Sequence, residues 1–474
     1  MSAGSPQPVP LDLSSPRRVH VVAIGGAGMS GIATILAQQG HRVTGSDLVE
    51  GPAVPGLRQL GARIVIGHDP SVVDGVDAVV VSTAVPDDDP EVLRARELGI
   101  PVLSRRDLLP AFAAVQPFVS ISGTHGKTTT SSMTAAVLRG VGADPSFLVG
   151  ARVPVLGAAA GSGAGDWFVL EADESDGSFL SGPRAAALLT NVEPDHLEFW
   201  GGWQQLCDGF AAFLSGTEGP TVVCADDPEA LRLGSEVGAA SYGTHDGATH
   251  RILDLDLGSH GSSFRFRSRD REEQVRVAVP GRHNALNAAG ALSLASELGV
   301  DLVAASEALA GYTGVARRFE DRGRAAGVQL VDDYAHLPTE VRAALAAGRS
   351  GDWGRVVAVF QPHRYSRTQA LWREFAGCFG DADLLVLTDI YAAGEAPRPG
   401  VSGRLLVDAV QEADPAAALR WCPTLDDVED LLVEELRPGD LCLTLGAGDV
   451  TSLADRLLPK LRDRERPDGP EAGS

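Results

Sequence analysis

The chain has 474 residues, 44% of them hydrophobic, and a formal net charge of −23 at pH 7. A chain of this length is expected to form two to four domains with sizeable cores. The acidic balance argues against a basic surface for nucleic acid, and no segment approaches the about 18 apolar residues of a membrane span. The five cysteines are scattered and include no C-x-x-C pair, which is typical of a reducing compartment. We therefore expect a cytoplasmic protein without a nucleic-acid or membrane partner and without a structural metal cluster.

The pattern of the first 115 residues predicts a short tail followed by a nucleotide-binding domain. Residues 1–16 lack the charged start and apolar run of a signal peptide, and we expect a disordered N-terminus. Strand and helix patterns alternate over 17–115, which predicts a Rossmann-like domain on a parallel sheet. Its first buried strand, at 19–24, is followed by a glycine turn and by a helix at 29–39.

A Gly26-x-Gly28-x-x-Gly31 pattern joins that strand to that helix. Glycines let the backbone approach a pyrophosphate, and the N-terminus of the helix offers free N–H groups to it. Asp47 ends the next predicted strand, where its carboxylate can accept a hydrogen bond from a ribose hydroxyl. NAD is the default ligand of such a loop, yet any nucleotide diphosphate satisfies the same chemistry. A tight structural turn without a ligand is the weaker alternative.

Residues 116–320 are expected to form a central P-loop ATPase domain with a parallel sheet and a small antiparallel sheet. Parallel strands are predicted at 118–122, 167–170 and 186–190, with a helix at 128–139. Over about 250–280, polar and apolar residues alternate around a charged turn, which predicts an antiparallel hairpin.

The loop after the first central strand carries the most specific motif. It consists of Gly123, Thr124, His125, Gly126, Lys127, Thr128 and Thr129. Its N–H groups and the Lys127 ammonium are placed to hold the β- and γ-phosphates of ATP, and the Thr128 hydroxyl to reach Mg²⁺. Ile121 occupies the place of the first glycine of a full Walker A loop. The 40 basic residues are 38 arginines and two lysines, Lys127 and Lys460, and an internal lysine that persists in such a chain favours a compact phosphate site.

Two further motifs are expected at the same edge of the central sheet. Four carboxylates follow the strand at 167–170: Glu171, Asp173, Glu174 and Asp176. Mg²⁺ prefers a few carboxylates with phosphate oxygens and water, so Glu171 is a predicted ligand, and some of the others are expected to be solvated. His196 follows the strand at 186–190; it is a candidate for a second metal ligand or a γ-phosphate contact, although a lone histidine is more often structural.

Residues 321–462 again alternate strand and helix, which predicts a Rossmann-like C-terminal domain, and the polar tail 463–474 is expected to be disordered. Thr424, with Asp427 three residues later, predicts a capping box at the start of a helix. Polar segments follow three of the predicted strands, where open α/β sheets place their ligands: 332–336, 361–367 and 446–449.

Two residue pairs in the last third of the chain leave alternatives open. Arg364 and Arg367 can fork a carboxylate or a phosphate, or can be surface arginines that pair with the acidic excess. His283 and Asn284 lie at the start of a helix, where an amide either caps the helix or contacts the edge of an adenine. The residues alone do not decide between these roles.

Together these motifs resemble those of the Mur ligase family, in the same order along the chain. The matching segments are AIGGAGMSGIA, GTHGKTTT, EADESD, NVEPDH, GRHNALNA, RRFE, DDYAHLPTE, FQPHRYSRT and GAGD. They extend from about residue 17 to 460. The resemblance implies an N-terminal domain for a UDP-sugar, a central ATPase domain, and a C-terminal domain that closes and brings the amino acid.

The resemblance also implies residue roles. The UDP-sugar site would comprise Gly26, Gly28, Met29, Ser30, Gly31, Asp47, Ser82, Thr83 and Arg317. The ATP site would comprise the loop 123–129, with His283 and Asn284 at the adenine. The Mg²⁺ site, which Mn²⁺ can also fill, would comprise Thr128, Glu171 and His196. The amino-acid site would comprise Tyr334, His336, Arg364 and Arg367. Lys127, His196 and His336 are the implied catalytic residues, and either histidine is a candidate to take the proton of the amine.

The implied activity is ATP-dependent ligation of L-alanine to the carboxylate of UDP-N-acetylmuramate through an acyl phosphate, by a monomer or a weak homodimer. A ligase that recycles muropeptides by adding a preformed tripeptide to the same sugar nucleotide has similar motifs. An NAD-sensing P-loop ATPase regulator is the alternative from another class. Leu337 stands where many family members have a second histidine. No lysine lies between Lys127 and Lys460 to be carbamylated, which agrees with the alanine-adding branch.

Overall fold

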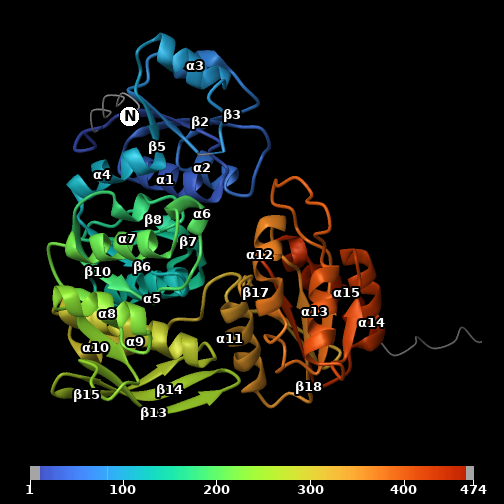
Figure 1. The fold of residues 1–474 in the computed structure, drawn as a ribbon. Helices are drawn as coiled ribbons and strands as arrows, with labels where there is room; N and C mark the ends of the chain where they lie inside the picture. Colours follow the sequence, from blue (N-terminus) through green and yellow to red (C-terminus); the bar gives the residue numbers. More distant parts are fainter. Residues whose placement is uncertain (1–10, 83, 466–474) are drawn as a thin grey trace, which may run out of the picture. The chain divides into compact units, whose positions relative to one another are not determined.

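The computed structural model describes residues 11–82 and 84–465, which form two compact units (Figure 1). The first unit contains the chain up to Asp254 with Phe264–Val275 and Leu286–Tyr312; the second contains Leu255–Ser263, Arg276–Ala285 and the chain from Thr313 on. Three sheets of five, ten and six strands confirm the expected three-domain α/β fold. In the described part of the chain, no helix is long and apolar enough to cross a membrane.

The N-terminal sheet has the order β3-β2-β1-β4-β5, and all of its strand pairs are parallel. Its strands are β1 Arg18–Val22, β2 Arg42–Asp47, β3 Arg63–Ile66, β4 Ala78–Val81 and β5 Val102–Ser104. Its helices are α1 Ala27–Gln38, α2 Val54–Gln59, α3 Pro90–Glu97 and α4 Arg105–Val115, with the short η1 at Pro70–Val73. The chain changes direction between β1 and β4, and open α/β sheets bind ligands at such a switch point. In the tail expected to be disordered, the side chain of Leu13 is buried in the core.

The central sheet has the order β15-β14-β13-β12-β11-β10-β6-β9-β7-β8. Its strands are β6 Phe118–Ser122, β7 Ser146–Val153, β8 Ala158–Gly161, β9 Phe168–Glu171, β10 Arg184–Leu189, β11 Thr221–Cys224, β12 Ala240–Gly243, β13 His250–Gly258, β14 Gly261–Ser268 and β15 Arg271–Val277. Its helices are α5 Lys127–Gly140, α6 Leu197–Trp200, α7 Trp203–Ser215, α8 Pro228–Val237, α9 Arg282–Glu297 and α10 Leu302–Ala310, with η2 Pro154–Leu156 and η3 Ser178–Leu180. The strands around the charged turn, β14 and β15, continue the main sheet, and at its other edge β8 pairs antiparallel with β7.

The C-terminal sheet has the order β16-β17-β21-β18-β19-β20; the β16–β17 pair is antiparallel and the other four neighbouring pairs are parallel. Its strands are β16 Glu320–Ala325, β17 Val328–Asp333, β18 Arg355–Phe360, β19 Leu384–Leu387, β20 Leu419–Trp421 and β21 Asp440–Leu445. Its helices are α11 Pro338–Arg349, α12 Tyr365–Phe375, α13 Arg404–Ala413, α14 Leu425–Glu435 and α15 Leu453–Glu465, with η4 at Asp449–Ser452. Thr424 and Asp427 form the expected capping box of α14. Helix α15 continues three residues beyond the predicted domain end at 462.

The apolar run of β18 explains how this sheet is covered on both faces. Val356, Ala358 and Phe360 belong to the core under α11, α12 and α13, whereas Val357 and Val359 belong to the core under α14 and α15. Successive strand residues point to opposite faces, so a strand covered on both sides is apolar throughout. The functional loops therefore emerge from a rigid, fully buried strand layer.

Candidate functional site

The phosphate loop, residues 123–129, joins β6 to α5 and requires glycine at two positions. Gly123 has a φ of 132° and Gly126 a φ of 79°, a region that other residues adopt at a cost. A Cβ on Gly123 would lie 2.1 Å from Oγ1 of Thr190, and one on Gly126 would lie 2.5 Å from Oδ1 of Asn287. The loop thus packs closely against the strand end of β10 and against α9, which fixes its shape.

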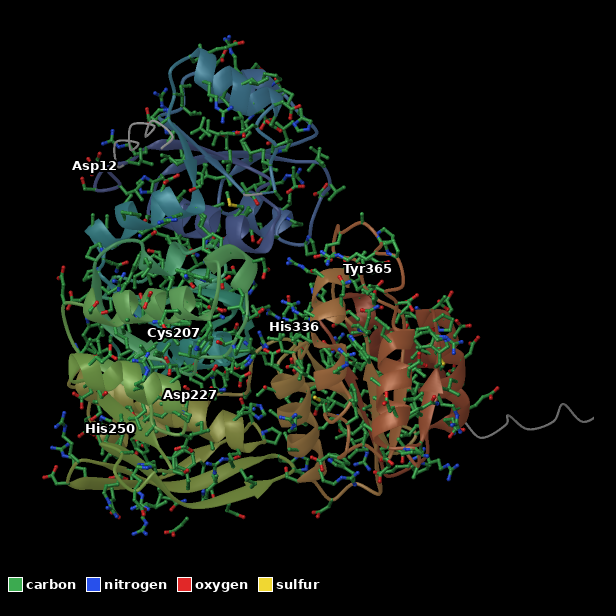
Figure 2. All side chains as sticks on the ribbon, in the orientation of Figure 1. Asp12, Cys207, Asp227, His250, His336 and Tyr365 are labelled. Carbon is green, nitrogen blue, oxygen red and sulfur yellow. The ribbon has the colours of Figure 1, made fainter. Side chains whose placement is uncertain are left out.

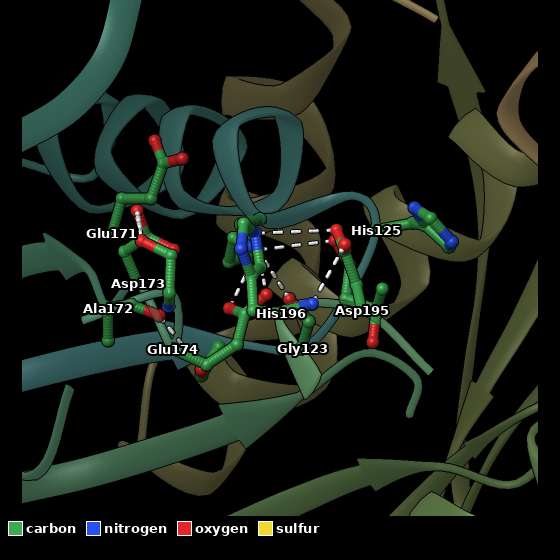
Figure 3. Close-up of polar contacts among 12 residues, drawn as sticks. Gly123, His125, Glu171, Ala172, Asp173, Glu174, Asp195 and His196 are labelled. Atoms are coloured by element: carbon green, nitrogen blue, oxygen red, sulfur yellow. Dashed lines mark hydrogen bonds and ion pairs between the residues drawn. The ribbon is translucent and has the colours of Figure 1, made fainter. Parts of the chain in front are cut away.

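The ammonium of Lys127 lies over this loop. It donates hydrogen bonds to the carbonyl oxygens of Gly123 at 2.8 Å and Thr124 at 3.2 Å, and it pairs with both carboxylate oxygens of Glu174 at 2.8 and 2.9 Å (Figure 3). Burial lowers the pKa of Lys127, but the charges of Glu174 and Asp173 outweigh burial and leave it above the usual value. Lys127 is therefore a fixed positive charge at the start of α5.

Thr128 and Glu171 place two oxygen donors side by side. The Thr128 hydroxyl donates to Oε1 of Glu171 at 2.7 Å, and Oε2 of Glu171 accepts from the N–H of Gly150 at 2.5 Å. Hydroxyl and carboxylate oxygens suit Mg²⁺, which needs few protein ligands when phosphates and water supply the rest. Within the described residues, no group of three or more His, Cys, Asp and Glu side chains is arranged to hold a metal ion. A pair of protein ligands is thus the arrangement that the residues fit.

His196 is the third predicted metal ligand, and its ring lies beside a carboxylate. Its Nε2 lies 3.4 Å from Oδ2 of Asp195, and its backbone has a positive φ of 52°. The same motif also contacts the phosphate loop, because the N–H of His125 donates to Oδ1 of Asn191 at 2.8 Å. The ring of His125 lies 3.2 Å from a carboxylate oxygen of Glu193. As predicted, β6, β9 and β10 are parallel neighbours, so these motifs share one edge of the sheet.

The glycine loop of the N-terminal domain is held by Asp47. Its Oδ2 accepts from the N–H of Gly25 at 2.8 Å, so the carboxylate expected at a ribose also shapes the loop. The side chain of Met29 is buried in the core, and a Cβ on Gly31 would lie 2.5 Å from Leu148 of β7. Hence Met29 and Gly31 can serve a ligand only through their backbone.

Of the other predicted UDP-sugar residues, Ser82 and Arg317 make hydrogen bonds within the protein. Oγ of Ser82 accepts from the N–H of Ala84 at 3.3 Å, and Thr83 lies outside the described residues. Arg317 belongs to the second unit, where its Nη2 donates to the carbonyl oxygens of Gly446 at 2.8 Å and Gly448 at 3.1 Å.

In the second unit, aromatic and imidazole rings gather after β17 and β18. The ring of His336 lies 5.3 Å from that of Tyr334 and 5.9 Å from that of His363, measured between centroids. The guanidinium groups of Arg317 and Arg318 lie 4.8 and 4.9 Å from the centre of the Tyr334 ring. Figure 2 labels His336, before α11, and Tyr365, at the start of α12. The predicted amino-acid residues are therefore close neighbours at the carboxyl edge of one sheet.

Hydrogen bonds assign complementary tautomers to the two histidines. Nδ1 of His336 lies 3.0 Å from the carbonyl oxygen of Tyr334 and 3.3 Å from Oε2 of Glu340, so Nδ1 carries the proton. Nδ1 of His363 accepts from Nη1 of Arg367 at 3.1 Å, so its proton lies on Nε2. Burial lowers the pKa of both imidazoles to about 4, which keeps them neutral near pH 7. His336 thus offers a lone pair at Nε2, and His363 offers an N–H.

The start of α12 is supported by the loop after β19, which carries no recognisable sequence motif. Arg364 has a φ of 70°, and its N–H donates to the carbonyl oxygen of Tyr391 at 2.9 Å. Glu395 accepts from the N–H of Ser366 at 2.9 Å and from its hydroxyl at 2.5 Å. The ring of Tyr391 stacks on His363 at 5.8 Å. Tyr391 and Glu395 are distant in the sequence from the start of α12, so no local sequence pattern predicted these contacts.

The predicted adenine residues, His283 and Asn284, also lie in the second unit. Nδ2 of Asn284 donates to the carbonyl oxygen of Pro280 at 2.7 Å. Burial lowers the pKa of His283 to about 4. A neutral imidazole at the start of α9 is compatible with a ring contact to a base. The hydrogen bond from Asn284 to Pro280 is a contact at the start of the helix, as in the capping alternative.

A phosphate loop on a parallel sheet, beside a Rossmann-like sheet with its own glycine loop, defines a multidomain α/β protein of the P-loop class. Three family models match in chain order: "Mur ligase family, catalytic domain" over residues 18–116, "Mur ligase middle domain" over 121–295 and "Mur ligase, glutamate ligase domain" over 317–448. The chain belongs to the Mur ligase family, whose members use ATP.

Named relatives match over nearly the whole chain. The UDP-N-acetylmuramate–L-alanine ligase of Rubrobacter xylanophilus is 43% identical over 94% of this chain and 100% of the relative. That of Halorhodospira halophila is 46% identical over 93% of both chains. The crystal structure of UDP-N-acetylmuramate-alanine ligase from Thermotoga maritima matches with a TM-score of 0.79 at 28% identity, over 94% of this chain and 100% of that one. A murein peptide ligase from Psychrobacter arcticus, with a TM-score of 0.68 at 23% identity over 94% and 99% of the two chains, shares the fold.

Proposed function

We propose that this protein joins L-alanine to the carboxylate of UDP-N-acetylmuramate, with conversion of ATP to ADP and phosphate, in the synthesis of peptidoglycan precursors. The observation that carries the proposal is the Lys127 loop with its Thr128–Glu171 pair, in a chain 43–46% identical to relatives that bear this name. ATP, UDP-N-acetylmuramate and L-alanine are its small-molecule substrates. The enzyme works in the cytoplasm as a monomer or a weak homodimer.

The first step forms an acyl phosphate. An oxygen of the muramoyl carboxylate attacks the γ-phosphorus of ATP, and ADP leaves. Phosphoryl transfer mainly needs positioning and neutralisation of charge, which Lys127 and the N–H groups of residues 123–129 supply. Thr128 and Glu171 would hold Mg²⁺, or Mn²⁺ in its place, which would supply positive charge to the phosphates.

The second step forms the amide bond. The amine of L-alanine attacks the acyl carbon, and phosphate leaves with one former carboxylate oxygen. Arg364 and Arg367 bind the carboxylate of the amino acid, because planar guanidinium groups match it. His336 takes the proton of the amine: its Nδ1–H is directed to Tyr334 and Glu340, which leaves Nε2 with a lone pair. His196, whose imidazole lies beside Asp195, contacts the γ-phosphate or the metal instead.

The remaining assignments concern the nucleotides. The glycine loop before α1 and Asp47 bind the UDP part, together with Ser82, Thr83 and Arg317. The pair His283 and Asn284 binds the adenine of ATP.

The test is phosphate release from ATP with UDP-N-acetylmuramate and one acceptor: L-alanine, glycine, L-serine or a muramyl-type tripeptide. Release that requires both the sugar nucleotide and L-alanine supports the proposal. Release only with the tripeptide would assign the chain to muropeptide recycling. No release with any acceptor, together with stabilisation of the N-terminal domain by NAD, would favour a nucleotide sensor.

A further inference from the structure

Arg105 lies at the junction of β5 and α4 in the N-terminal domain. A capping box fixes this junction: the N–H of Ser104 donates to Oδ2 of Asp107 at 2.9 Å, and Oγ of Ser104 accepts from the N–H of Asp107 at 3.3 Å. Since β1, β4 and β5 are parallel, the end of β5 and the glycine loop after β1 lie at the same edge of the sheet. Chain order alone, with 76 residues between Gly28 and Arg105, does not reveal this proximity.

The guanidinium of Arg105 lies against the glycine loop. A Cβ built on Gly28 would be 3.5 Å from its Nη1 atom. Its Nε is buried and has no hydrogen-bond partner within the described part of the chain. A buried donor without a partner is destabilising, because the group has lost its water. Such a donor beside the free N–H groups of a helix start is suited to an anion.

Neighbouring arginines show that this situation is not general in the domain. Arg94 donates to Asp74 at 3.0 Å, and Arg96 donates to Asp87 at 2.8 Å, both at exposed positions. Within residues 11–82 and 84–465, the guanidinium of Arg105 has no such pair with a carboxylate.

We propose that Arg105 binds the diphosphate of the sugar nucleotide, together with the backbone N–H groups at the start of α1. The inference rests on the proposed function, because it deepens the assignment of the UDP site. The glycine loop supplies dipoles and space but no positive side chain, whereas a nucleoside diphosphate is strongly anionic. Arg105 supplies that charge from another strand, and its planar fork can donate two parallel hydrogen bonds to phosphate oxygens.

The test compares binding of UDP and of uridine to the full-length protein by isothermal titration calorimetry. The variants are Arg105→Met, which keeps much of the apolar stem, and Arg105→Lys, which keeps the charge without the fork. Arg96→Met is the matched control, because it removes the same charge from an exposed position of the same domain. Thermal unfolding of each variant reports whether the domain remains folded.

Charge-assisted hydrogen bonds of this kind predict that Arg105→Met weakens UDP binding about 10–100-fold, with uridine binding unchanged. Arg105→Lys is expected to recover part of the loss, and Arg96→Met to bind UDP like the wild type. Unchanged UDP binding in Arg105→Met, or equal losses for UDP and uridine, would overturn the assignment while leaving the proposed function intact. A wild-type protein that binds no UDP and releases no L-alanine-dependent phosphate would overturn both.

Discussion

The two glycine loops of the first unit have the same position in their sheets but different electrostatics. Each follows the first strand of its sheet in chain order, which has parallel neighbours, and opens a helix, α1 in one case and α5 in the other. The loop before α5 contains its own cation, Lys127, which contacts two loop carbonyls and Glu174. The loop before α1 contains no cationic residue, and the N–H of Gly25 in it donates to the carboxylate of Asp47.

This difference shows that glycine spacing predicts where a phosphate can bind, but does not predict which charged side chain lies beside the phosphate. A transferring γ-phosphate needs a compact cation at a fixed position, and a lysine within the loop meets that requirement. A diphosphate that is only held can be bound by backbone N–H groups and a guanidinium from a neighbouring strand. The two loops are therefore expected to respond differently to substitution.

Lys127→Ala gives the largest effect and separates the loops most sharply. Loss of this charge at the phosphates is expected to lower kcat by about 1,000-fold or more, because electrostatic stabilisation is a large part of phosphoryl transfer. UDP binding is expected to remain at the wild-type level. Phosphate release and calorimetry with UDP measure the two outcomes, and equal loss of both would refute the division of labour.

Gly126→Ala and Gly28→Ala test how much room each loop leaves for an added Cβ atom. At Gly126 the φ of 79° and the 2.5 Å approach to Asn287 predict a destabilisation of about 1–3 kcal/mol and weaker ATP binding. At Gly28 the nearest atom to a new Cβ is 3.5 Å away, which is ordinary contact, so the fold should be nearly unaffected. Thermal unfolding and ATP titration of both variants provide the measurement; similar behaviour of the two would contradict the difference in packing.

The pH dependence of stability tests the imidazole cluster of the second unit, which is neutral near pH 7, unlike the cationic phosphate loop. His336 and His363 have pKa values of about 4 in the folded chain, below the ordinary 6.5. Between pH 6.5 and 4 the unfolded chain binds protons that the folded chain does not, so stability falls as the pH falls through this window. The unfolding midpoint should therefore drop between pH 7.5 and 5, and drop less in His336→Gln. The same drop in both proteins would count against a neutral buried His336.

Asp47→Ala tests the smaller contribution of a side chain that shapes the first loop. Removal of the hydrogen bond to the N–H of Gly25 and of any ribose contact is expected to raise the KM for UDP-N-acetylmuramate about 10-fold. The KM for ATP should not change. A shift in the KM for ATP of similar size would mean that Asp47 supports the whole unit rather than its own loop.

Local patterns predicted much of this structure. Glycine-rich turns between an apolar run and a helix pattern located both loops, and the Thr424–Asp427 spacing located the start of α14. Of the strands that were not predicted, β8, β11 and β12 have four residues each, and runs this short leave little periodic signal. Periodicity also could not show that Met29 is buried, since that depends on how α1 packs on the central sheet.

Contacts between distant segments were the least predictable part of the site. Glu395 caps α12 from 29 residues away, and Arg105 approaches Gly28 from another strand. Both depend on strand order, which sequence spacing does not contain. The motif residues were recognisable because each follows a strand directly, whereas their partners lie at loop positions without a pattern of their own.

The most direct test of the account is transfer of oxygen from the sugar nucleotide to phosphate. UDP-N-acetylmuramate labelled with ¹⁸O in its carboxylate is incubated with ATP, L-alanine and the enzyme, and the released phosphate is analysed by mass spectrometry. An acyl phosphate intermediate predicts one ¹⁸O atom in each phosphate from labelled substrate, and formation of the L-alanyl product in equal amount. Unlabelled phosphate, or phosphate release that does not require L-alanine, would contradict ligation through the Lys127 loop.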